Sequence, residues 1–255
     1  MANSDILKLS NYGKTVIGVY DKSVKSITIP DGVTKIRDRA FSDCSSLQSI
    51  DIPNSVTEIG EKVFHFCSSL QSINVSKDNM HYASVDGILF NKDLTVIVRF
   101  PQKNDVKEYV IPTSVTEIGD WAFYGCSSLQ SIDIPDGVTE IRNNAFSGCS
   151  SLQSINIPNS VTEIGHSAFS GCSSLQSIDI PDSVTEIGES AFSGCSSLEH
   201  IYLHYNEVEK LKVGKNIFEG VNLDKCILHV PSGTRWAYRH HDVFKHFKNI
   251  VTTGF

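Results

Sequence analysis

Cysteine is the residue type of this 255-residue chain whose spacing most strongly suggests chemistry. Six of the seven cysteines lie in the same local motif, and apart from one longer gap they are 23 residues apart. Zinc sites use cysteines in close pairs such as C-x-x-C, and the chain contains no such pair. We therefore predict a column of small buried side chains rather than a metal site. The six residues are Cys44, Cys67, Cys126, Cys149, Cys172 and Cys195.

Histidine and tyrosine form a second candidate site. His200, Tyr202 and His204 alternate along a predicted strand, so the three side chains share one exposed face. The two histidines are four residues apart, which is too far along a strand for both to bind one metal ion. Aromatic residues here replace Ser and Asp of the other units, which favours a protein-binding patch. Packing against the C-terminal segment is the alternative.

Two further side chains, Trp121 and Tyr124, also replace small or polar residues of the other units. His65 and Phe66 occupy matching positions one unit earlier, just before an insertion. Two interpretations stay open for these four residues. They either pack against the insertion or form an exposed recognition patch.

Acidic residues recur in two columns. We interpret both columns as solvated faces, because no loop has the spacing of calcium ligands. In the second column Asp alternates with Asn, which roughly doubles the distance between charges to about 10 Å and relieves their repulsion. Asp133 and Asp179 remain candidate protein-binding residues. The first column contains Glu58, Glu117, Glu140, Glu163 and Glu186, and the second contains Asp51, Asn74, Asp133, Asn156 and Asp179.

Composition and motifs argue against several classes of protein. Nucleophilic triads, glycine-rich phosphate loops and H-E-x-x-H are absent, so we expect no catalysis, no cofactor and no metal. No apolar run approaches the ~18 residues that a membrane span needs. Residues 111–204 hold one arginine and eleven acidic residues, a net charge of −10, which disfavours nucleic acid as a partner.

A 23-residue repeat must position all of these residues. The unit runs from proline to proline and contains an Ala-Phe-Ser-Gly-Cys core followed by a short alternating strand. One unit cannot enclose its apolar side chains, but stacked units can. Asp43 and Phe66 stand where later units have glycine, which predicts that this position does not require a positive φ. The phenylalanines expected to form the structural core with the cysteines are Phe41, Phe64, Phe123, Phe146, Phe169 and Phe192.

The repeats occupy residues 31–76 and 112–204 and are separated by an insertion at 77–111. Within the insertion, two β-prone runs around Asn91–Asp93 predict a hairpin. Residues 9–20 align with residues 89–100, so we expect residues 1–30 to form a hairpin cap. Residues 205–255 are a degenerate repeat and a cap in which aromatic residues, including Trp236, cover the last coil. Residues 1–255 are thus predicted to form a single domain.

The motif Val-Thr-x-Ile-x-x-x-Ala-Phe-x-x-Cys-x-x-Leu-x-x-Ile-x-Ile-Pro resembles the leucine-rich repeats of the BspA type, found in Bacteroides-like bacterial surface proteins and some protists. Residues 85–92 resemble a hairpin of that family, and residues 230–251 resemble its closing segment. The resemblance implies a leucine-rich-repeat solenoid, a right-handed superhelix with a parallel sheet and short 3₁₀ turns in place of long helices. A parallel β-helix, which would lack the Phe-centred turn, is the alternative fold.

The resemblance also implies a non-catalytic protein-binding role, which in some members is adhesion to host fibronectin or fibrinogen. An intracellular scaffold and a self-associating structural protein are the alternatives; an enzyme is the hypothesis from another class. The family implies a cell-surface or secreted location. Residues 1–9 lack the basic-then-apolar pattern of an export signal, which favours the cytoplasm, so both locations stay open.

Overall fold

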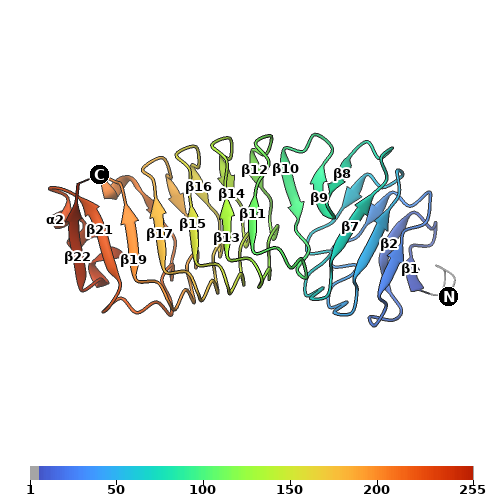
Figure 1. Ribbon diagram of the computed structural model, residues 1–255, viewed down its shortest axis with the longest axis horizontal. Coiled ribbons are helices and arrows are strands. Elements are labelled where there is room, and N and C mark those ends of the chain that lie inside the picture. The colour runs from blue at the N-terminus through green and yellow to red at the C-terminus, as the bar shows by residue number, and fades with distance from the viewer. Residues whose placement is uncertain (1–5, 255) are drawn as a thin grey trace. The chain divides into compact units, whose positions relative to one another are not determined.

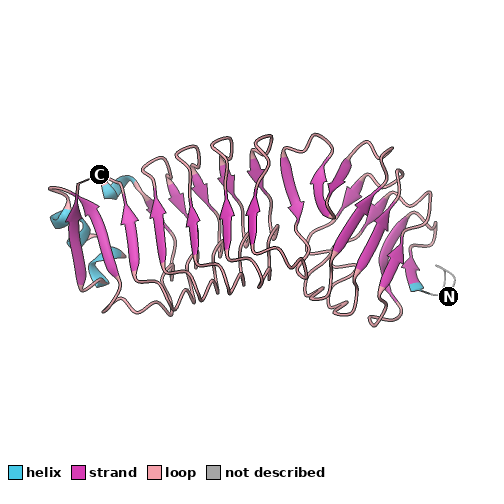
Figure 2. Ribbon diagram, viewed as in Figure 1, coloured by secondary structure: helices cyan, strands magenta, loops and turns pink. Residues whose placement is uncertain are grey.

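Short strands separated by hydrogen-bonded turns make up the chain, because each unit supplies few consecutive residues with alternating burial. The computed structural model describes residues 6–254. Residues 1–5, which open the predicted cap and the segment considered for an export signal, lie outside the described residues, as does residue 255. Strands dominate the described part, and its helices lie mainly near the C-terminal end (Figure 2). The chain divides into two compact units.

Unit 1 contains residues 6–104 and 123–126 of the described chain. Each of its repeat turns contributes one strand to each of two sheets, and the paired repeat strands are parallel (Figure 1). One sheet has the order β1 (Leu7–Leu9), β2 (Thr15–Val19), β4 (Lys35–Ile36) and β6 (Glu58–Ile59), and the other has the order β3 (Ser26–Thr28), β5 (Ser49–Ile52) and β7 (Ser72–Val75). Strands β1 and β2 form an antiparallel hairpin next to the first repeat turn.

The insertion in unit 1 forms three antiparallel strands, β8 (Tyr82–Val85), β9 (Ile88–Asn91) and β10 (Val96–Arg99). The sequence predicted only the last two, because Tyr82–Val85 has no clear alternation of apolar and polar residues. The Asn91 side chain closes the predicted turn: its Oδ1 accepts hydrogen bonds from the backbone N–H groups of Thr95 and Val96 at 2.9 Å.

Unit 2 contains residues 105–122 and 127–254 of the described chain. Its repeat turns pair in register at a constant step, so that Ser131, Ser154, Ser177 and His200 lie in one row. One sheet of the unit comprises β12 (Glu117–Ile118), β14 (Glu140–Ile141), β16 (Glu163–Ile164), β18 (Glu186–Ile187) and β20 (Lys212–Val213). The other has the order β11 (Glu108–Val110), β13 (Ser131–Asp133), β15 (Ser154–Asn156), β17 (Ser177–Ile180), β19 (His200–Leu203), β21 (Ile227–Pro231) and β22 (Asn249–Thr253), and all its neighbours are parallel.

The third side of each repeat turn is a short turn closed by bonds between residues three apart, such as Cys149 N–H to Phe146 O at 3.1 Å. The same segment also bonds to the following turn, for example Phe146 N–H to Ala168 O at 2.8 Å. Two residues of each turn have positive φ, four positions apart. The prediction that the second of these positions does not require a positive φ is wrong, because Asp43 and Phe66 have φ of 62° and 56°.

The C-terminal end of unit 2 contains η1 (Val208–Lys210), α2 (Arg235–His240) and η2 (Phe244–His246). Tyr238, Phe244 and Phe247 of this segment are buried and pack against Phe218 or one another. Trp236 is 72% exposed, so the prediction that it covers the last coil is wrong. It instead stacks on His240 at the surface, with ring centroids 4.2 Å apart.

Candidate functional site

The phenylalanine and cysteine columns lie inside the units. All six phenylalanines and all seven cysteines are buried. In unit 2 the Phe146 and Phe169 rings stack at 5.3 Å with an interplanar angle of 3°. In unit 1 the Phe41 and Phe64 rings stack less regularly, at 5.9 Å and 23°. These residues build the core that holds the surface columns in register.

Four cysteine thiols, those of Cys67, Cys126, Cys172 and Cys195, have a backbone carbonyl as hydrogen-bond partner. Cys67 Sγ donates to Phe41 O at 3.1 Å, and Cys195 Sγ donates to Phe169 O at 3.2 Å, one turn earlier in both cases. Burial raises the pKa of both thiols to about 12, so thiolate is scarce at neutral pH. The cysteine column therefore lacks the exposed thiolate that nucleophilic or metal chemistry requires.

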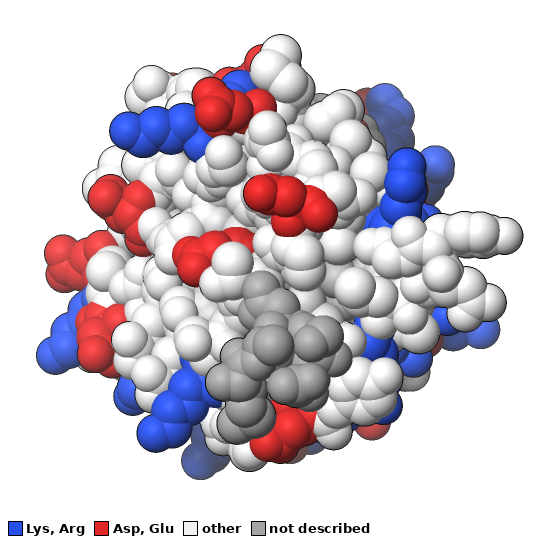
Figure 3. Space-filling model, turned by 90° about the vertical axis from the view of Figure 1, so that its right-hand side faces the viewer, with Lys and Arg blue, Asp and Glu red and all other residues white. Residues whose placement is uncertain are grey.

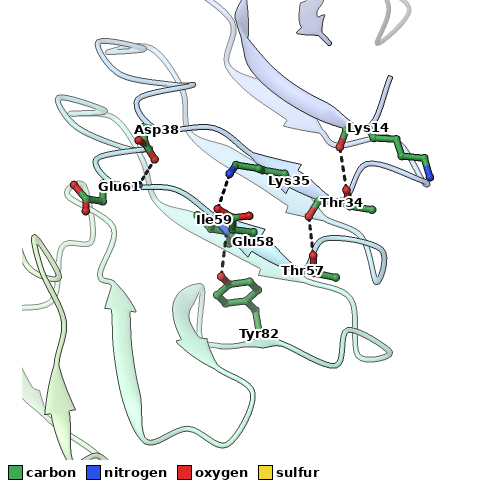
Figure 4. Close-up of polar contacts among 9 residues, drawn as sticks. All are labelled: Lys14, Thr34, Lys35, Asp38, Thr57, Glu58, Ile59, Glu61 and Tyr82. Carbon is green, nitrogen blue, oxygen red and sulfur yellow. Dashed lines mark hydrogen bonds and ion pairs between the residues drawn. The ribbon is translucent and has the colours of Figure 1, made fainter. Parts of the chain in front are cut away.

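Polar side chains bond from one turn to the next along the outside of unit 1 (Figure 4). Thr57 Oγ1 donates to Thr34 O at 3.2 Å, and the Glu61 N–H donates to Asp38 Oδ1 at 2.9 Å. Tyr82, from the insertion, accepts the Ile59 N–H at its hydroxyl oxygen at 3.1 Å. These contacts use the polar atoms for structure, since each satisfies a backbone group of a neighbouring strand or turn.

Unit 2 repeats one of these ladders at the position that Asp38 and Glu61 occupy in unit 1. Asp120 Oδ1 accepts the Asn143 N–H at 2.9 Å, and Asn143 Oδ1 accepts the His166 N–H at 2.8 Å. His166 Nδ1 then accepts the Glu189 N–H at 3.0 Å. The sequence analysis missed this column, although every member has a side chain that can accept a hydrogen bond.

The glutamate column lies on the sheet of β12 to β20 in unit 2, where the register aligns Glu117, Glu140, Glu163, Glu186 and Lys212. Arg142 Nε lies 2.8 Å from Glu117 and 3.4 Å from Glu140. In unit 1 the Lys35 ammonium pairs with Glu58 at 2.6 Å (Figure 4). Basic residues therefore offset part of the like-charge repulsion in this column.

The charges of unit 1 are of both signs. Residues 1–104 contain twelve basic and eleven acidic residues. On the N-terminal end of the chain, Lys and Arg atoms and Asp and Glu atoms are interspersed (Figure 3). In the aspartate–asparagine column, Asn74 Nδ2 donates to Asp51 Oδ1 at 2.9 Å, so the asparagine bonds to the neighbouring carboxylate as well as spacing the charges.

The exposed face of the seven-stranded sheet in unit 2 carries the candidate site near the C-terminus. The register places Ser177 beside His200 and Asp179 beside Tyr202, and it places Tyr202 beside His229 of β21. His204 Nε2 lies 2.6 Å from Asp179 Oδ1. We call Asp179, His200, Tyr202, His204 and His229 the β19 patch. The other predicted residue on this face, Asp133, is exposed on β13, two strands from Asp179.

His229 is the member of the β19 patch that the sequence analysis missed. Its ring stacks on Tyr202 with centroids 4.2 Å apart and an interplanar angle of 16°. Its Nε2 lies 3.0 Å from His200 Nδ1, and its Nδ1 lies 3.2 Å from Thr253 Oγ1. Burial and then the neighbouring His200 lower the pKa of His229. The neutral imidazole is therefore favoured at pH 7, and it joins β19 to β21 and β22.

Tyr124 and Trp121 have different surroundings. Tyr124 stacks on His65 at 4.5 Å and meets Phe66 edge-on at 5.8 Å, within unit 1. Beneath them the buried Arg99 donates from Nη2 to Phe64 O at 3.4 Å and Tyr124 O at 3.2 Å. Phe66 is half-exposed at 50%, so this group is packed and partly open to solvent. Trp121, in unit 2, is half-buried and has a φ of 62°.

Surface depressions lie on the described parts of both units. One of about 360 Å³ in unit 2 contains Tyr205, whose hydroxyl donates to Val184 O at 2.7 Å, and Lys210, which pairs with Glu207. Between residues 6 and 254, no three histidine, cysteine or acidic side chains are placed to hold a metal ion. In the same part of the chain, no helix has the length and apolar composition needed to cross a membrane.

Comparison with known proteins decides the family. The model of the BspA-type leucine-rich repeat region matches residues 19–102 and 97–224. The chain belongs to the BspA-type leucine-rich repeat family. This confirms the resemblance and the predicted solenoid with parallel sheets. Proteins of this family and fold are repeat scaffolds, typically non-catalytic, and are consistent with a protein-interaction role. No curated protein shows a significant match.

Solved structures of bacterial leucine-rich repeat proteins are similar to this chain. A leucine-rich cell surface protein of Faecalibacterium prausnitzii is 30% identical with a TM-score of 0.64; the match covers 91% of this chain and 60% of that protein. The pneumococcal vaccine antigen PcpA is 22% identical with a TM-score of 0.71, and coverage is 91% and 69%. A leucine-rich repeat protein of Eubacterium ventriosum is 19% identical with a TM-score of 0.55, and coverage is 79% and 77%.

Proposed function

We propose that the chain is a non-catalytic protein-binding module and that the β19 patch is its binding surface. The observation that supports this most directly is the cluster of Tyr202, His200 and His229 on an exposed sheet face. The preceding turns present small polar or acidic residues in the same rows. Tyrosine contributes large contact area at low conformational cost, and an aromatic cluster on an otherwise polar sheet therefore favours this position as the binding centre.

The absence of catalysis is part of the proposal. The thiols of the repeated Gly-Cys-Ser segment are buried, and their pKa values are raised by burial. The histidines of the β19 patch bond to Asp179, to Thr253 or to each other, and none of these bonds activates a serine or cysteine nucleophile. Binding needs only the surface that these residues form.

The role that we propose is that of a surface adhesin for host extracellular-matrix proteins. One similar structure is that of a cell surface protein, and another is that of a vaccine antigen. An intracellular scaffold is the alternative location and role. Fractionation of native cells with an antibody to the chain distinguishes them: recovery in the surface fraction supports the adhesin, and recovery in the cytosol supports the scaffold.

The binding test uses immobilised fibronectin and fibrinogen as probes. A triple variant, His200→Ser, Tyr202→Asp and His204→Pro, gives β19 the residues of β17 (Ser177, Asp179 and Pro181) and should therefore fold. We expect the affinity for the bound matrix protein to fall at least tenfold. The matched control is Asn156→Asp, which gives β15 the aspartate that β13 and β17 already have.

Two outcomes would contradict this proposal. Equal affinity of the triple variant and the parent chain would remove the β19 patch as the binding surface. Failure of the parent chain to bind either matrix protein would remove the adhesin role for these two partners. Circular dichroism of each variant establishes that the repeats remain folded.

Self-association is a second candidate, supported by the position of β22 at the end of its sheet. The strand Asn249–Thr253 has no charged residue, and uncharged edge strands pair readily with other strands. Light scattering between about 1 and 100 μM should show a molar mass that rises with concentration. Val251→Lys should abolish the rise, because an edge lysine opposes strand pairing; a constant molar mass in the parent chain excludes self-association.

We also propose that residues 1–255 act as one domain. A single transition in chemical unfolding, with the same midpoint for circular dichroism and for the fluorescence of the two tryptophans, Trp121 and Trp236, supports it. Release by limited proteolysis of a folded fragment that begins near residue 105 would contradict it.

A further inference from the structure

The seven-stranded sheet of unit 2 contains no lysine or arginine in its strands. The seven strands contain three acidic residues, Glu108, Asp133 and Asp179, and no lysine or arginine. Lys107 precedes β11, which lies four strands from β19. Lys225 lies two residues before β21, and Lys248 precedes β22 and pairs with Asp224 at 3.4 Å. At neutral pH, with neutral imidazoles, the face around Tyr202 is therefore negatively charged.

The aromatic and acidic groups on this face match the side chains of a basic peptide. Asp133 and Asp179 are two strands apart, a distance of about 10 Å. Side chains on one face of an extended peptide are about 7 Å apart at two residues and about 13 Å apart at four, so long lysine or arginine side chains on that face can reach both carboxylates. Tyr202 is one strand beyond Asp179 and is half-buried, so part of its ring is open to a cation. A segment with regularly spaced lysine or arginine can therefore contact the two carboxylates and the ring.

Three histidines on this surface would add positive charge on acidification and offset its carboxylates. His200 and His229 face each other through one N···N contact of 3.0 Å, which can hold only one proton between the two nitrogens. Protonation of both rings must break this contact and disturb the stack of His229 on Tyr202. His204 Nε2 lies 2.6 Å from Asp179 Oδ1, so a positive charge on this ring would offset that carboxylate. Thr253 Oγ1 lies 3.2 Å from His229 Nδ1, and the charged residues next to the pair along the chain are Glu199, directly before His200, and Lys225, four residues before His229.

We infer that the β19 patch and Asp133 bind a basic, extended peptide segment at neutral pH and release it when the three histidines become protonated. This inference rests on the proposed function, because it names the partner chemistry and the regulation of the same surface. The aromatic–imidazole cluster provides the contact area, the carboxylates provide the charge complementarity, and the histidine pair provides the dependence on pH.

The experiment measures fluorescence anisotropy of a labelled dodecapeptide of alternating arginine and serine, with a glutamate–serine peptide as the charge-reversed probe. At pH 7.5 and 150 mM salt we expect the arginine peptide to bind at least tenfold more tightly than the glutamate peptide. Tyr202→Asn and Asp179→Asn should each weaken it at least fivefold. Glu163→Gln is the matched control, because it removes the same charge from the other sheet of the unit and should leave the affinity unchanged.

At pH 5.0 the arginine peptide should bind at least tenfold more weakly to the parent chain. The double variant His200→Ser, His229→Gln should lose most of this dependence on pH. Equal losses of affinity for Asp179→Asn and Glu163→Gln would overturn the inference and indicate unspecific electrostatic attraction. Unchanged affinity of the parent chain at pH 5.0 would also overturn it, as would unchanged affinity of the Tyr202→Asn variant. If the arginine peptide fails to bind while a matrix protein binds and the triple variant loses it, the inference is wrong and the proposed function stands.

Discussion

The two units use one repeat in different ways. In unit 2 the Phe146, Phe169 and Phe192 rings stack within 3° of parallel, and glycine occupies the second positive-φ position of each turn. In unit 1 the ring stack is tilted by 23°, Asp43 and Phe66 occupy that position, and a three-stranded insertion follows the second repeat turn. Near-identical turns allow regular packing, whereas each departure in unit 1 requires a local compensation, such as the buried Arg99.

The largest expected effect is the loss of a ring from the regular stack. Phe169→Ala should reduce the free energy of unfolding by about 3–5 kcal/mol, because the site is buried and cannot collapse fully. Phe169 stacks on a ring on each side, at 5.3 and 5.4 Å, whereas Phe41 stacks on Phe64 alone among the ring pairs described. Phe41→Ala should therefore cost less. Urea unfolding measures both, and a larger loss for Phe41→Ala would contradict the greater contribution of the regular ring stack in unit 2.

The buried arginine tests the compensation in unit 1. Arg99→Ala removes a packed side chain and leaves the carbonyl groups of Phe64 and Tyr124 without its hydrogen bonds. The free energy of unfolding should fall by about 2–3 kcal/mol, the range for breaking a buried polar contact. Arg39→Ala is the control, because Arg39 is exposed and its loss should cost under about 0.5 kcal/mol. Similar losses for both variants would show that the Arg99 contacts contribute little.

The backbone positions with positive φ give a reciprocal test between the units. Gly171 has a φ of 73°, and an added Cβ would lie 3.7 Å from Gly148, so Gly171→Ala has space but acquires an unfavourable backbone conformation. We expect a loss of about 1–2 kcal/mol. Phe66→Gly relieves the same conformation in unit 1 and should raise stability or leave it unchanged. A large destabilisation by Phe66→Gly would mean that its contacts with His65 and Tyr124 outweigh the backbone cost.

The smallest expected effect is the dependence of stability on pH. Burial lowers the pKa of His65 in unit 1 and of His229 and His241 in unit 2 below the unfolded value near 6.5. The unfolded chain then binds more protons, so this stabilisation is present above pH 6.5 and is lost as the pH falls below it. The melting temperature should decrease between pH 7.5 and pH 5. His229→Gln should reduce the decrease, and an unchanged slope would exclude a contribution from that residue.

The repeated features of the fold could be predicted from the sequence because the period repeats every local signal several times. The columns of phenylalanine and cysteine follow directly from the 23-residue spacing. Non-repeating features could not be predicted in the same way. His229 follows its neighbour Tyr202 by 27 residues instead of 23, because the intervening unit is degenerate, so no column pointed to it.

Burial and backbone conformation were also beyond the sequence pattern at single positions. Arg99 is buried although arginine is normally exposed, because the carbonyl groups of Phe64 and Tyr124 accept its hydrogen bonds. Trp236 is exposed although the other aromatic residues of its segment are buried, because the six-residue helix α2 directs Tyr238 inward. Phe66 keeps a positive φ because the hydrogen bonds of the turn fix the backbone, not because the residue prefers it.

The near-identical turns of unit 2 make it difficult for each strand to pair with its correct neighbour during folding. If β13 paired with β17 and omitted β15, it would still align Ser131 with Ser177, Ile132 with Ile178 and Asp133 with Asp179. Local pairing energies therefore discriminate poorly between the correct neighbour and the next one. Some residues occur only once, among them the β19 patch and the buried aromatic residues of the C-terminal segment. These residues favour the correct pairing of strands, because a skipped turn would remove their contacts with their neighbours.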